Sequence, residues 1–180
     1  MSGRDELLAL LRRDAYKEGR FRLASGRESD FFIDCKRVML TAEGHRLIGS
    51  VLFDEVAAME DVAGVAGVAL GGCPLVSAVS LTSALRGKPF DALYVRKEAK
   101  DHGTGRRVEG SVPAGAEVVL LEDVLTTGGS SRAAVEALRA EGWRVSRVLA
   151  LVDREEGAVA ALAALGLTAR GLFHRADFVR

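Results

Sequence analysis

The sequence predicts an α/β protein in which a mainly parallel, twisted sheet is flanked by helices. The apolar runs 62–70 and 118–121 lack polar alternation, which is typical of central strands buried on both faces. From residue 62 onward, runs of this kind alternate with stretches whose apolar residues have helical spacing. That order favours right-handed crossovers between parallel strands. At 180 residues, the chain is long enough for one well-buried core, so we expect a single domain.

Local patterns assign the elements in chain order. Residues 5–17 carry leucines on one helical face, which indicates an amphipathic helix that packs on the rest of the protein. We then expect two short strands at 21–24 and 31–33, a helix over 45–58 capped by Thr41, a strand at 62–70, a tight turn at 71–74, a helix at 75–85, a strand at 91–96, a strand at 118–121, a helix at 132–142, a strand at 143–152, a helix at 158–165 and a short edge strand or tail at the end.

Composition limits the class of protein. Lysine plus arginine and aspartate plus glutamate each number 25, so there is no general basic field to attract nucleic acid. Cys35 and Cys73 are far apart and lack metal-ligand spacing, which indicates ordinary thiols in a reducing compartment. No apolar run approaches the roughly 20 residues of a membrane span, and the first residues lack the apolar core of a signal peptide. We therefore expect a cytoplasmic protein that binds neither nucleic acid nor membranes.

The stretch 118–131 joins a buried strand to two acids and then to a loop rich in hydroxyls and glycine. Gly128 and Gly129 can turn successive N–H groups toward one anion, and the threonines and serines around them, up to Ser131, add hydroxyl donors where a helix begins. The lysine of a triphosphate P-loop is absent, as is a dinucleotide GxGxxG pattern. Glu122 and Asp123 would be repelled by a phosphate unless they accept hydrogen bonds from a neutral group, and ribose hydroxyls meet that requirement. The stretch therefore predicts a site for a ribose 5-phosphate.

Two other predicted strand ends carry groups suited to an anionic ligand. The segment 96–107 is rich in arginine and lysine and has almost nothing apolar, so it is either a solvated hairpin tip or a flexible cationic lid over a polyphosphate. Gly71 and Gly72 are either a plain tight turn or a place where a ligand approaches the backbone closely. Because ligands bind at the carboxyl ends of the strands in an open parallel sheet, we expect these groups to converge with Glu122 and Asp123.

These motifs resemble those of a known family. The sequence LLEDVLTTGGS at 120–130 resembles the phosphoribosyl-pyrophosphate (PRPP) motif of the type I phosphoribosyltransferases, and RKEAKDHGTG at 96–105 is similar to the catalytic loop of the orotate phosphoribosyltransferases. Ser-Gly-Arg at 25–27 and Asp-Arg at 153–154 also stand in the expected order. The resemblance covers nearly the whole chain. It implies the type I phosphoribosyltransferase fold over 1–180, with an N-terminal hood of short strands and a helix over about 1–40 and a flexible catalytic loop over about 97–110.

The resemblance also implies a reaction and its residues. The 5-phosphoribosyl group would pass from PRPP to orotate, giving orotidine 5'-monophosphate and pyrophosphate in pyrimidine biosynthesis. Magnesium would be held through PRPP with no direct protein ligand, and the basic loop would close over the neighbouring subunit's site in a homodimer. The implied catalytic residues are Lys100, His102 and Asp123; the implied PRPP contacts are Arg96, Lys97, Lys100, His102, Glu122, Asp123, Val124, Leu125, Thr126, Thr127, Gly128, Gly129 and Ser130; the implied orotate contacts are Thr126, Arg154 and Phe32; and the implied pyrophosphate loop is Gly71, Gly72 and Cys73.

The sequence departs from some relatives at two positions where they carry lysine. Ala24 precedes the Ser-Gly-Arg turn, and the turn after the strand at 62–70 is Gly-Gly-Cys-Pro. Lys36 or Arg37 could supply the missing charge. Two other functions compete with the one implied. A purine phosphoribosyltransferase would share 122–131 but has no reason to keep Arg154 or the basic loop, and a non-catalytic PRPP-sensing regulator should carry a basic surface or a nucleic-acid-binding segment.

Overall fold

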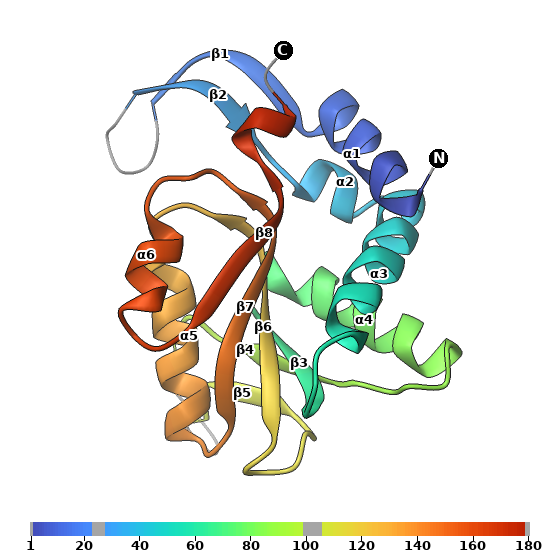
Figure 1. Cartoon of the computed structure of the whole chain (residues 1–180), viewed down its shortest axis with the longest axis vertical. Helices are drawn as coiled ribbons and strands as arrows, with labels where there is room; N and C mark the ends of the chain where they lie inside the picture. Colours follow the sequence, from blue (N-terminus) through green and yellow to red (C-terminus); the bar gives the residue numbers. More distant parts are fainter. Residues whose placement is uncertain (1, 23–27, 99–105, 179–180) are drawn as a thin grey trace.

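The fold is a twisted sheet covered by helices on both faces, with a smaller N-terminal unit at one end (Figure 1). The computed structural model describes residues 2–22, 28–98 and 106–178; Ala24, the turn 25–27, Lys100 and His102 lie outside these ranges. The elements are α1 Gly3–Asp14, β1 Tyr16–Arg22, β2 Glu28–Ile33, α2 Lys36–Met39, α3 Ala42–Ala57, β3 Val62–Val68, α4 Gly72–Leu85, β4 Asp91–Val95, β5 Val108–Gly110, β6 Glu117–Leu125, α5 Gly129–Ala140, β7 Arg144–Asp153, α6 Ala158–Ala163, β8 Thr168–His174 and the 3-10 helix η1 Arg175–Asp177.

The main sheet has the strand order β5-β4-β3-β6-β7-β8. Strands β4, β3, β6, β7 and β8 are mutually parallel, which confirms the predicted architecture, and β8 is the expected edge strand. Strand β5 pairs antiparallel with β4 and occupies the last residues of the segment expected to be a loop. Its first residue, Val108, is 4% exposed and lies opposite Val95. The pairing with β4 and the burial of Val108 hold the returning chain against the edge of the sheet.

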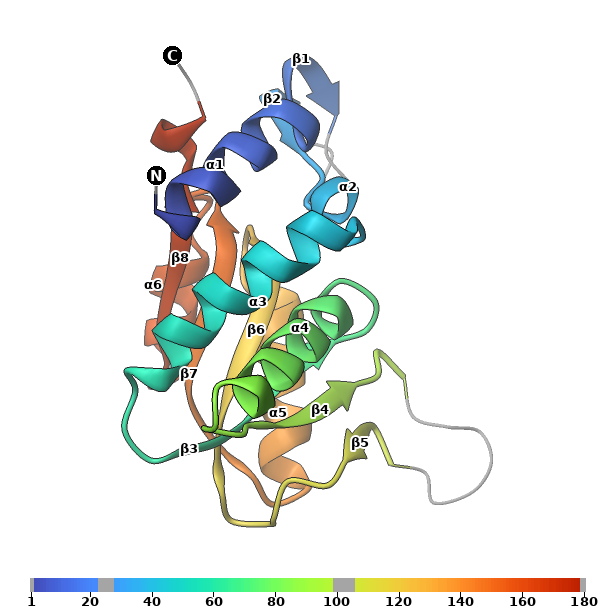
Figure 2. The same cartoon turned by 90° about the vertical axis from the view of Figure 1, so that its right-hand side faces the viewer.

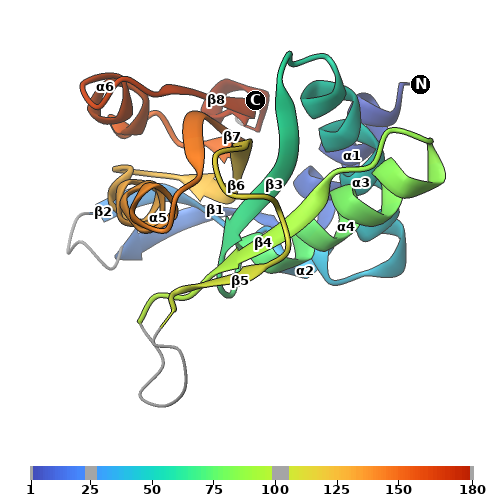
Figure 3. The same cartoon turned by 90° about the horizontal axis from the view of Figure 1, so that it is seen from below.

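Helices α1, α3 and α4 lie on one side of the sheet and α5 and α6 on the other (Figure 3), and each face of the sheet covers a hydrophobic core. One core lies under α1, α3 and α4, and the other lies under α5 and α6. Strand β6 serves both, because Val119 and Leu121 belong to the first core whereas Val118 and Leu120 belong to the second. All four side chains are fully buried, as the sequence predicted for a central strand.

Helix α4 begins earlier than expected because the backbones of β3 and α4 are in close contact. The predicted turn 71–74 is instead the first turn of the helix, which starts at Gly72. A Cβ atom on Gly72 would lie 2.7 Å from Cα of Gly67, and one on Gly67 would lie 2.7 Å from the carbonyl oxygen of Gly72. Glycine at both positions therefore lets α4 start directly above the end of β3.

The N-terminal unit differs from expectation at its helix ends. Helix α1 begins with a capping box between Ser2 and Asp5 and ends at Asp14, whereas the periodicity predicted a helix to residue 17. Tyr16 instead opens β1, where it pairs with Ile33 of the antiparallel strand β2. The short helix α2, which the sequence did not predict, then turns the chain toward α3. Strands β1 and β2 lie above the upper end of the main sheet (Figures 1 and 2).

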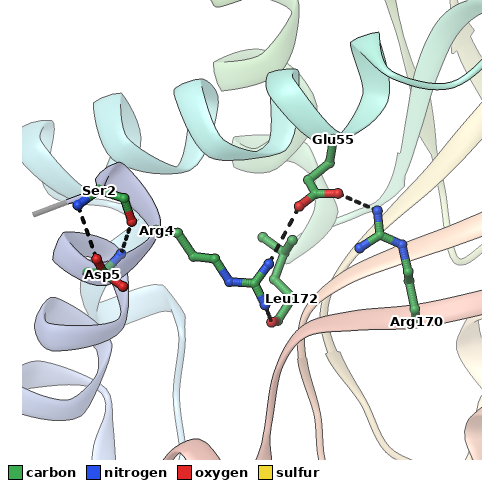
Figure 4. A network of polar contacts seen from close by, with 6 residues as sticks. All are labelled: Ser2, Arg4, Asp5, Glu55, Arg170 and Leu172. Carbon is green, nitrogen blue, oxygen red and sulfur yellow. Dashed lines mark hydrogen bonds and ion pairs between the residues drawn. The ribbon is translucent and has the colours of Figure 1, made fainter.

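A charged cluster attaches α1 to the main body (Figure 4). Arg4 donates a hydrogen bond to the carbonyl oxygen of Leu172 in β8, and its guanidinium lies 3.6 Å from a carboxylate oxygen of Glu55 in α3. The other oxygen of Glu55 accepts a hydrogen bond from Arg170 of β8. Glu55 thus links the N-terminal helix to the edge strand.

Both cysteines are free thiols, with Cys35 buried and Cys73 partly buried. Burial raises the pKa of each thiol. In the part of the chain that the structure describes, no helix combines the length and the apolar character needed to cross a membrane.

Candidate active site

The candidate site lies at the carboxyl ends of the parallel strands, where the sequence placed it. Strand β6 is longer than expected and extends to Leu125, which lies opposite Asp153 at the end of β7. Glu122 and Asp123 are therefore part of the strand and do not follow it. Because successive side chains of a strand point to opposite faces, the two carboxylates are directed to different sides of the sheet. The structure thus separates two acids that the sequence presented as a pair.

Glu122 faces α5. Its side chain is 4% exposed, and its oxygen Oε1 accepts a hydrogen bond from Ser131 Oγ at 2.8 Å and a longer one from Ser130 Oγ at 3.3 Å. Burial raises the pKa of this carboxyl group to about 7, with a further increase from the charge of Asp123, and the two serine hydroxyls act in the opposite direction. Glu122 is therefore poised between its charged and neutral forms near neutral pH.

Asp123 faces the N-terminal unit and the start of α4. Its oxygen Oδ1 accepts from the backbone N–H of Val124 at 3.0 Å, and its Oδ2 lies 3.8 Å from Nζ of Lys36. A Cβ atom on Gly71 would come within 2.8 Å of the carboxylate, so only glycine leaves it undisturbed. The expected convergence of Gly71 with Asp123 is present.

Lys36 carries a cation into this side of the site from α2. Its Nζ lies 3.2 Å from Oδ1 of Asp34 in addition to its approach to Asp123. Partial burial lowers the pKa of Lys36, but the hydrogen bond to Asp34 and the charge of Asp123 outweigh it and raise the pKa overall. Lys36 therefore stays protonated beside Asp123.

The loop between β6 and α5 has the form of an anion cradle. Gly128 adopts a left-handed conformation with φ of 81°, which suits glycine, and its carbonyl oxygen accepts the N–H of Arg132 in the first turn of α5. The helix begins at Gly129, three residues before the predicted start at 132. No atom lies within 4 Å of a Cβ placed on Gly129, so the space above it is open. The N–H groups of this first turn are suited to a phosphate.

The residues of the β6 to α5 stretch differ in how they can contact a ligand. Thr127, Gly129 and Ser130 are exposed, and Thr126 is half-buried. Leu125 is 1% exposed, so its side chain belongs to the core and only its backbone is suited to contact a ligand. The side chain of Ser131 is fully buried and bonded to Glu122, so the expectation that its hydroxyl faces the phosphate is wrong.

The described ends of the basic segment lie beside the cradle. Arg96, Lys97 and Arg107 line a cavity of about 240 Å³ that also includes Ser130 and the first turns of α5. Arg107 donates hydrogen bonds to the carbonyl oxygens of Arg96 and Lys97, which joins the outgoing and returning chains. Lys100 and His102 lie outside the described residues.

Arg154 lies at the end of β7 with its side chain 5% exposed. Its guanidinium carbon is 4.7 Å from the ring centroid of Phe31, and its Nε is 2.9 Å from Oε1 of Glu156. Phe31 is thus an aromatic side chain that contacts Arg154. The resemblance implied Phe32 as an orotate contact, which stays a prediction. Phe32 is 39% exposed and packs against Phe21 on the other face of the β1–β2 pair. Strand alternation could have identified Phe31 as the inward residue.

Comparison with known proteins identifies the class. The phosphoribosyl transferase domain family matches residues 40–163. An orotate phosphoribosyltransferase from Sorangium cellulosum is 58% identical over 181 residues, which cover 99% of this chain and 94% of that protein. The crystal structure of Mycobacterium tuberculosis H37Rv orotate phosphoribosyltransferase in complex with Fe(III) dicitrate has a TM-score of 0.86 at 38% identity and covers 99% of this chain and 100% of that chain. A structure of the same enzyme in complex with PRPP has a TM-score of 0.81 at 35% identity, covering 98% and 99% of the two chains.

The fold is that of a type I phosphoribosyltransferase. The chain belongs to this family and, within it, to the orotate phosphoribosyltransferases.

Proposed function

We propose that the chain transfers the 5-phosphoribosyl group of PRPP to orotate, giving orotidine 5'-monophosphate and pyrophosphate, in pyrimidine biosynthesis. The observation that carries the proposal is the junction of β6 and β7. Strand β6 carries the two acids and leads into the proposed anion cradle. The backbone N–H of Arg154, directly after β7, donates to the carbonyl oxygen of Leu125 at 2.9 Å. This hydrogen bond places Arg154 next to the residues that we propose to bind the ribose phosphate, which supports the proposal.

PRPP would bind across the end of β6. The 5-phosphate would accept hydrogen bonds from the backbone and hydroxyl groups of 126–130, at the N-terminus of α5. Glu122 and Asp123 would accept the ribose hydroxyls from opposite faces of the strand. Magnesium bound through PRPP would neutralise charge on the departing pyrophosphate, and an oxygen-rich ligand with carboxylates nearby is the environment this ion prefers. We propose no direct protein ligand for it.

In the reaction, a ring nitrogen of orotate attacks the anomeric carbon as the bond to pyrophosphate breaks. The bonding electrons leave with pyrophosphate, so negative charge grows on the leaving group while positive charge grows on the ribose. Lys97, Lys100 and His102 would stabilise the leaving group, and closure of the basic loop would exclude water. We further propose that Lys36 supplies the cation that some relatives place in the turn after β3, because it lies beside Asp123. Arg37 lacks such a contact among the described residues.

Arg154 would select orotate over bases without a carboxylate. A guanidinium group pairs with a carboxylate through two parallel hydrogen bonds. Uracil and the purine bases have no carboxylate and therefore cannot form this pair. Phe31 and Glu156 hold the guanidinium in one orientation, which reduces the entropy lost when orotate binds.

Several expectations from the sequence stay predictions. We expect a homodimer in which the loop at about 97–110 closes over the site of the neighbouring subunit. We also expect that 1–180 form one domain with a hood over about 1–40, and that the protein is cytoplasmic.

Base preference tests the proposal. The protein is incubated with PRPP, magnesium and orotate, uracil, adenine or hypoxanthine, and nucleotide formation is followed for each. We expect orotate to be preferred by at least about a hundredfold in kcat/KM, because a lost charge-assisted pair costs about 3 kcal/mol. Preference for any other base would refute the proposal.

A further inference from the structure

Two serines of α5 donate to the same oxygen of Glu122 but differ in environment. Ser131 is fully buried and lies 2.8 Å from Oε1, whereas Ser130 is exposed and lies 3.3 Å away. Among the described residues, Oε2 of Glu122 accepts no hydrogen bond. One carboxylate oxygen is thus fixed from the protein interior and the other is available to a ligand.

We propose that Ser131 is a positioning residue for Glu122: its buried hydroxyl holds the carboxylate in the ionised form and orientation that accept a ribose hydroxyl. The inference rests on the proposed function, since it assigns Glu122 to the ribose of PRPP. A hydroxyl has one proton to donate, so Ser131 cannot also donate to the 5-phosphate. Its burial separates it from that phosphate in any case.

Ser130 and Ser131 then have different tasks. Ser130 is exposed in the first turn of α5, where the 5-phosphate is expected, and its hydroxyl would leave Glu122 when phosphate binds. Ser131 has no such competitor and keeps its contact throughout. After phosphate binding, Ser131 is the hydroxyl donor that remains on Glu122 among the described side chains.

The surroundings of Glu122 make this donor important. Burial and the charge of Asp123 both raise the pKa of Glu122, and the serine hydroxyls oppose them. Lys36 pairs with Asp123 on the opposite face of β6, and the β7 residue opposite Glu122 is Ala150, which carries no charge. With Ser131 removed, the described donor that remains on α5 is Ser130, whose contact is longer and which would leave Glu122 when phosphate binds. The neutral form of Glu122 therefore becomes more populated.

The test compares Ser131→Ala with the wild type by the pH dependence of kcat/KM for PRPP and by the ¹³C carboxyl titration of Glu122, assigned with Glu122→Gln. In Ser131→Ala we expect the midpoint of the pH profile and the midpoint of the Glu122 titration each to rise by about one pH unit. As a result, kcat/KM should fall about fivefold at pH 7 and by less than about twofold at pH 9. Ser131→Cys, with a weak donor of similar size, should shift both midpoints in the same direction by a smaller amount.

Ser83→Ala is the matched control, because Ser83 of α4 is also a fully buried helical serine. Its hydroxyl donates to the carbonyl oxygen of Ser80 and accepts the backbone N–H of Phe90, and neither partner belongs to the proposed site. This variant should leave both midpoints unchanged. The positioning role is refuted if Ser131→Ala and Ser131→Cys lower kcat/KM equally at all pH values while Glu122 titrates as in the wild type. Failure of the proposed function gives a different result, because the wild type would then form no orotidine 5'-monophosphate. The ¹³C titration of Glu122 would still show whether Ser131 shifts its midpoint.

Discussion

Gly71 lies against Asp123 so closely that a Cβ atom on Gly71 would be 2.8 Å from the carboxylate. Gly71→Ala should therefore displace the Asp123 side chain and raise the KM for PRPP about tenfold, since positioning errors at a reacting site are costly. The backbone of Gly71 has φ of −64°, so alanine causes no backbone strain there. Gly3→Ala is the control, because the nearest atom to its added Cβ would be 3.7 Å away. Equal KM values for the two variants would contradict the contact.

Glu122→Gln should change how stability depends on pH. Burial raises the pKa of Glu122 to about 7 from a reference of 4.5, so its neutral form favours the folded state. This contribution is present below about pH 4.5 and is lost as pH rises to about 7. The glutamine variant lacks it, so its unfolding free energy relative to wild type should increase by up to about 3 kcal/mol between pH 4.5 and 8. Urea denaturation at a series of pH values measures the difference, and parallel curves would disprove the assignment.

Arg154→Lys should weaken orotate use while leaving PRPP binding in place. Lysine keeps the charge but loses the planar fork, so we expect the KM for orotate to rise about tenfold to hundredfold. Arg132→Lys on α5, an exposed arginine 3.6 Å from Glu136, is the control and should behave as wild type. An unchanged KM for orotate in Arg154→Lys would exclude Arg154 from the base site.

Glu55 should contribute modestly to attachment of the N-terminal helix (Figure 4). The Arg4 and Arg170 side chains that meet it are 49% and 44% exposed, so solvent screens both pairs. A double-mutant cycle between Arg4→Ala and Glu55→Ala should give a coupling of about 0.5 kcal/mol in urea denaturation, with turnover unchanged. A coupling above about 2 kcal/mol would mean that the cluster is a major determinant of stability.

Subunit mixing tests the proposed sharing of the basic loop. Lys100→Ala and Glu122→Gln should each be nearly inactive alone. If the loop serves the neighbouring site, dimers formed from one copy of each variant contain one intact site, and random mixing should restore about a quarter of wild-type activity. Absence of recovery in chromatographically confirmed mixed dimers would show that each loop serves its own subunit.

Much of the fold could be predicted because apolar runs and helical spacing dominate this chain. The central strand 118–121, the parallel order and the cap at Thr41 all appear in the structure. Local patterns failed where long-range contacts decide. Strand β5 forms because it pairs with β4. Helix α4 starts at Gly72 because the backbones of Gly72 and Gly67 in β3 pack closely against each other.

The same division holds for the candidate site. The acids and the cradle were identifiable from residue types, and their approximate place followed from the rule for parallel sheets. The separation of Glu122 from Asp123 could not be predicted, because it depends on β6 continuing past the buried run 118–121. The contact of Ser131 with Glu122 depends in turn on α5 starting at Gly129. The direction in which these side chains point depends on where β6 ends and where α5 begins. The ends of helices and strands are the features that local sequence determines least well.

The most direct test of the account is the stoichiometry of products formed from PRPP and orotate in the presence of magnesium. We predict that orotidine 5'-monophosphate and pyrophosphate accumulate in equal amounts and that Glu122→Gln reduces both together. Release of pyrophosphate without the nucleotide, or binding of PRPP without consumption of orotate, would contradict the assignment.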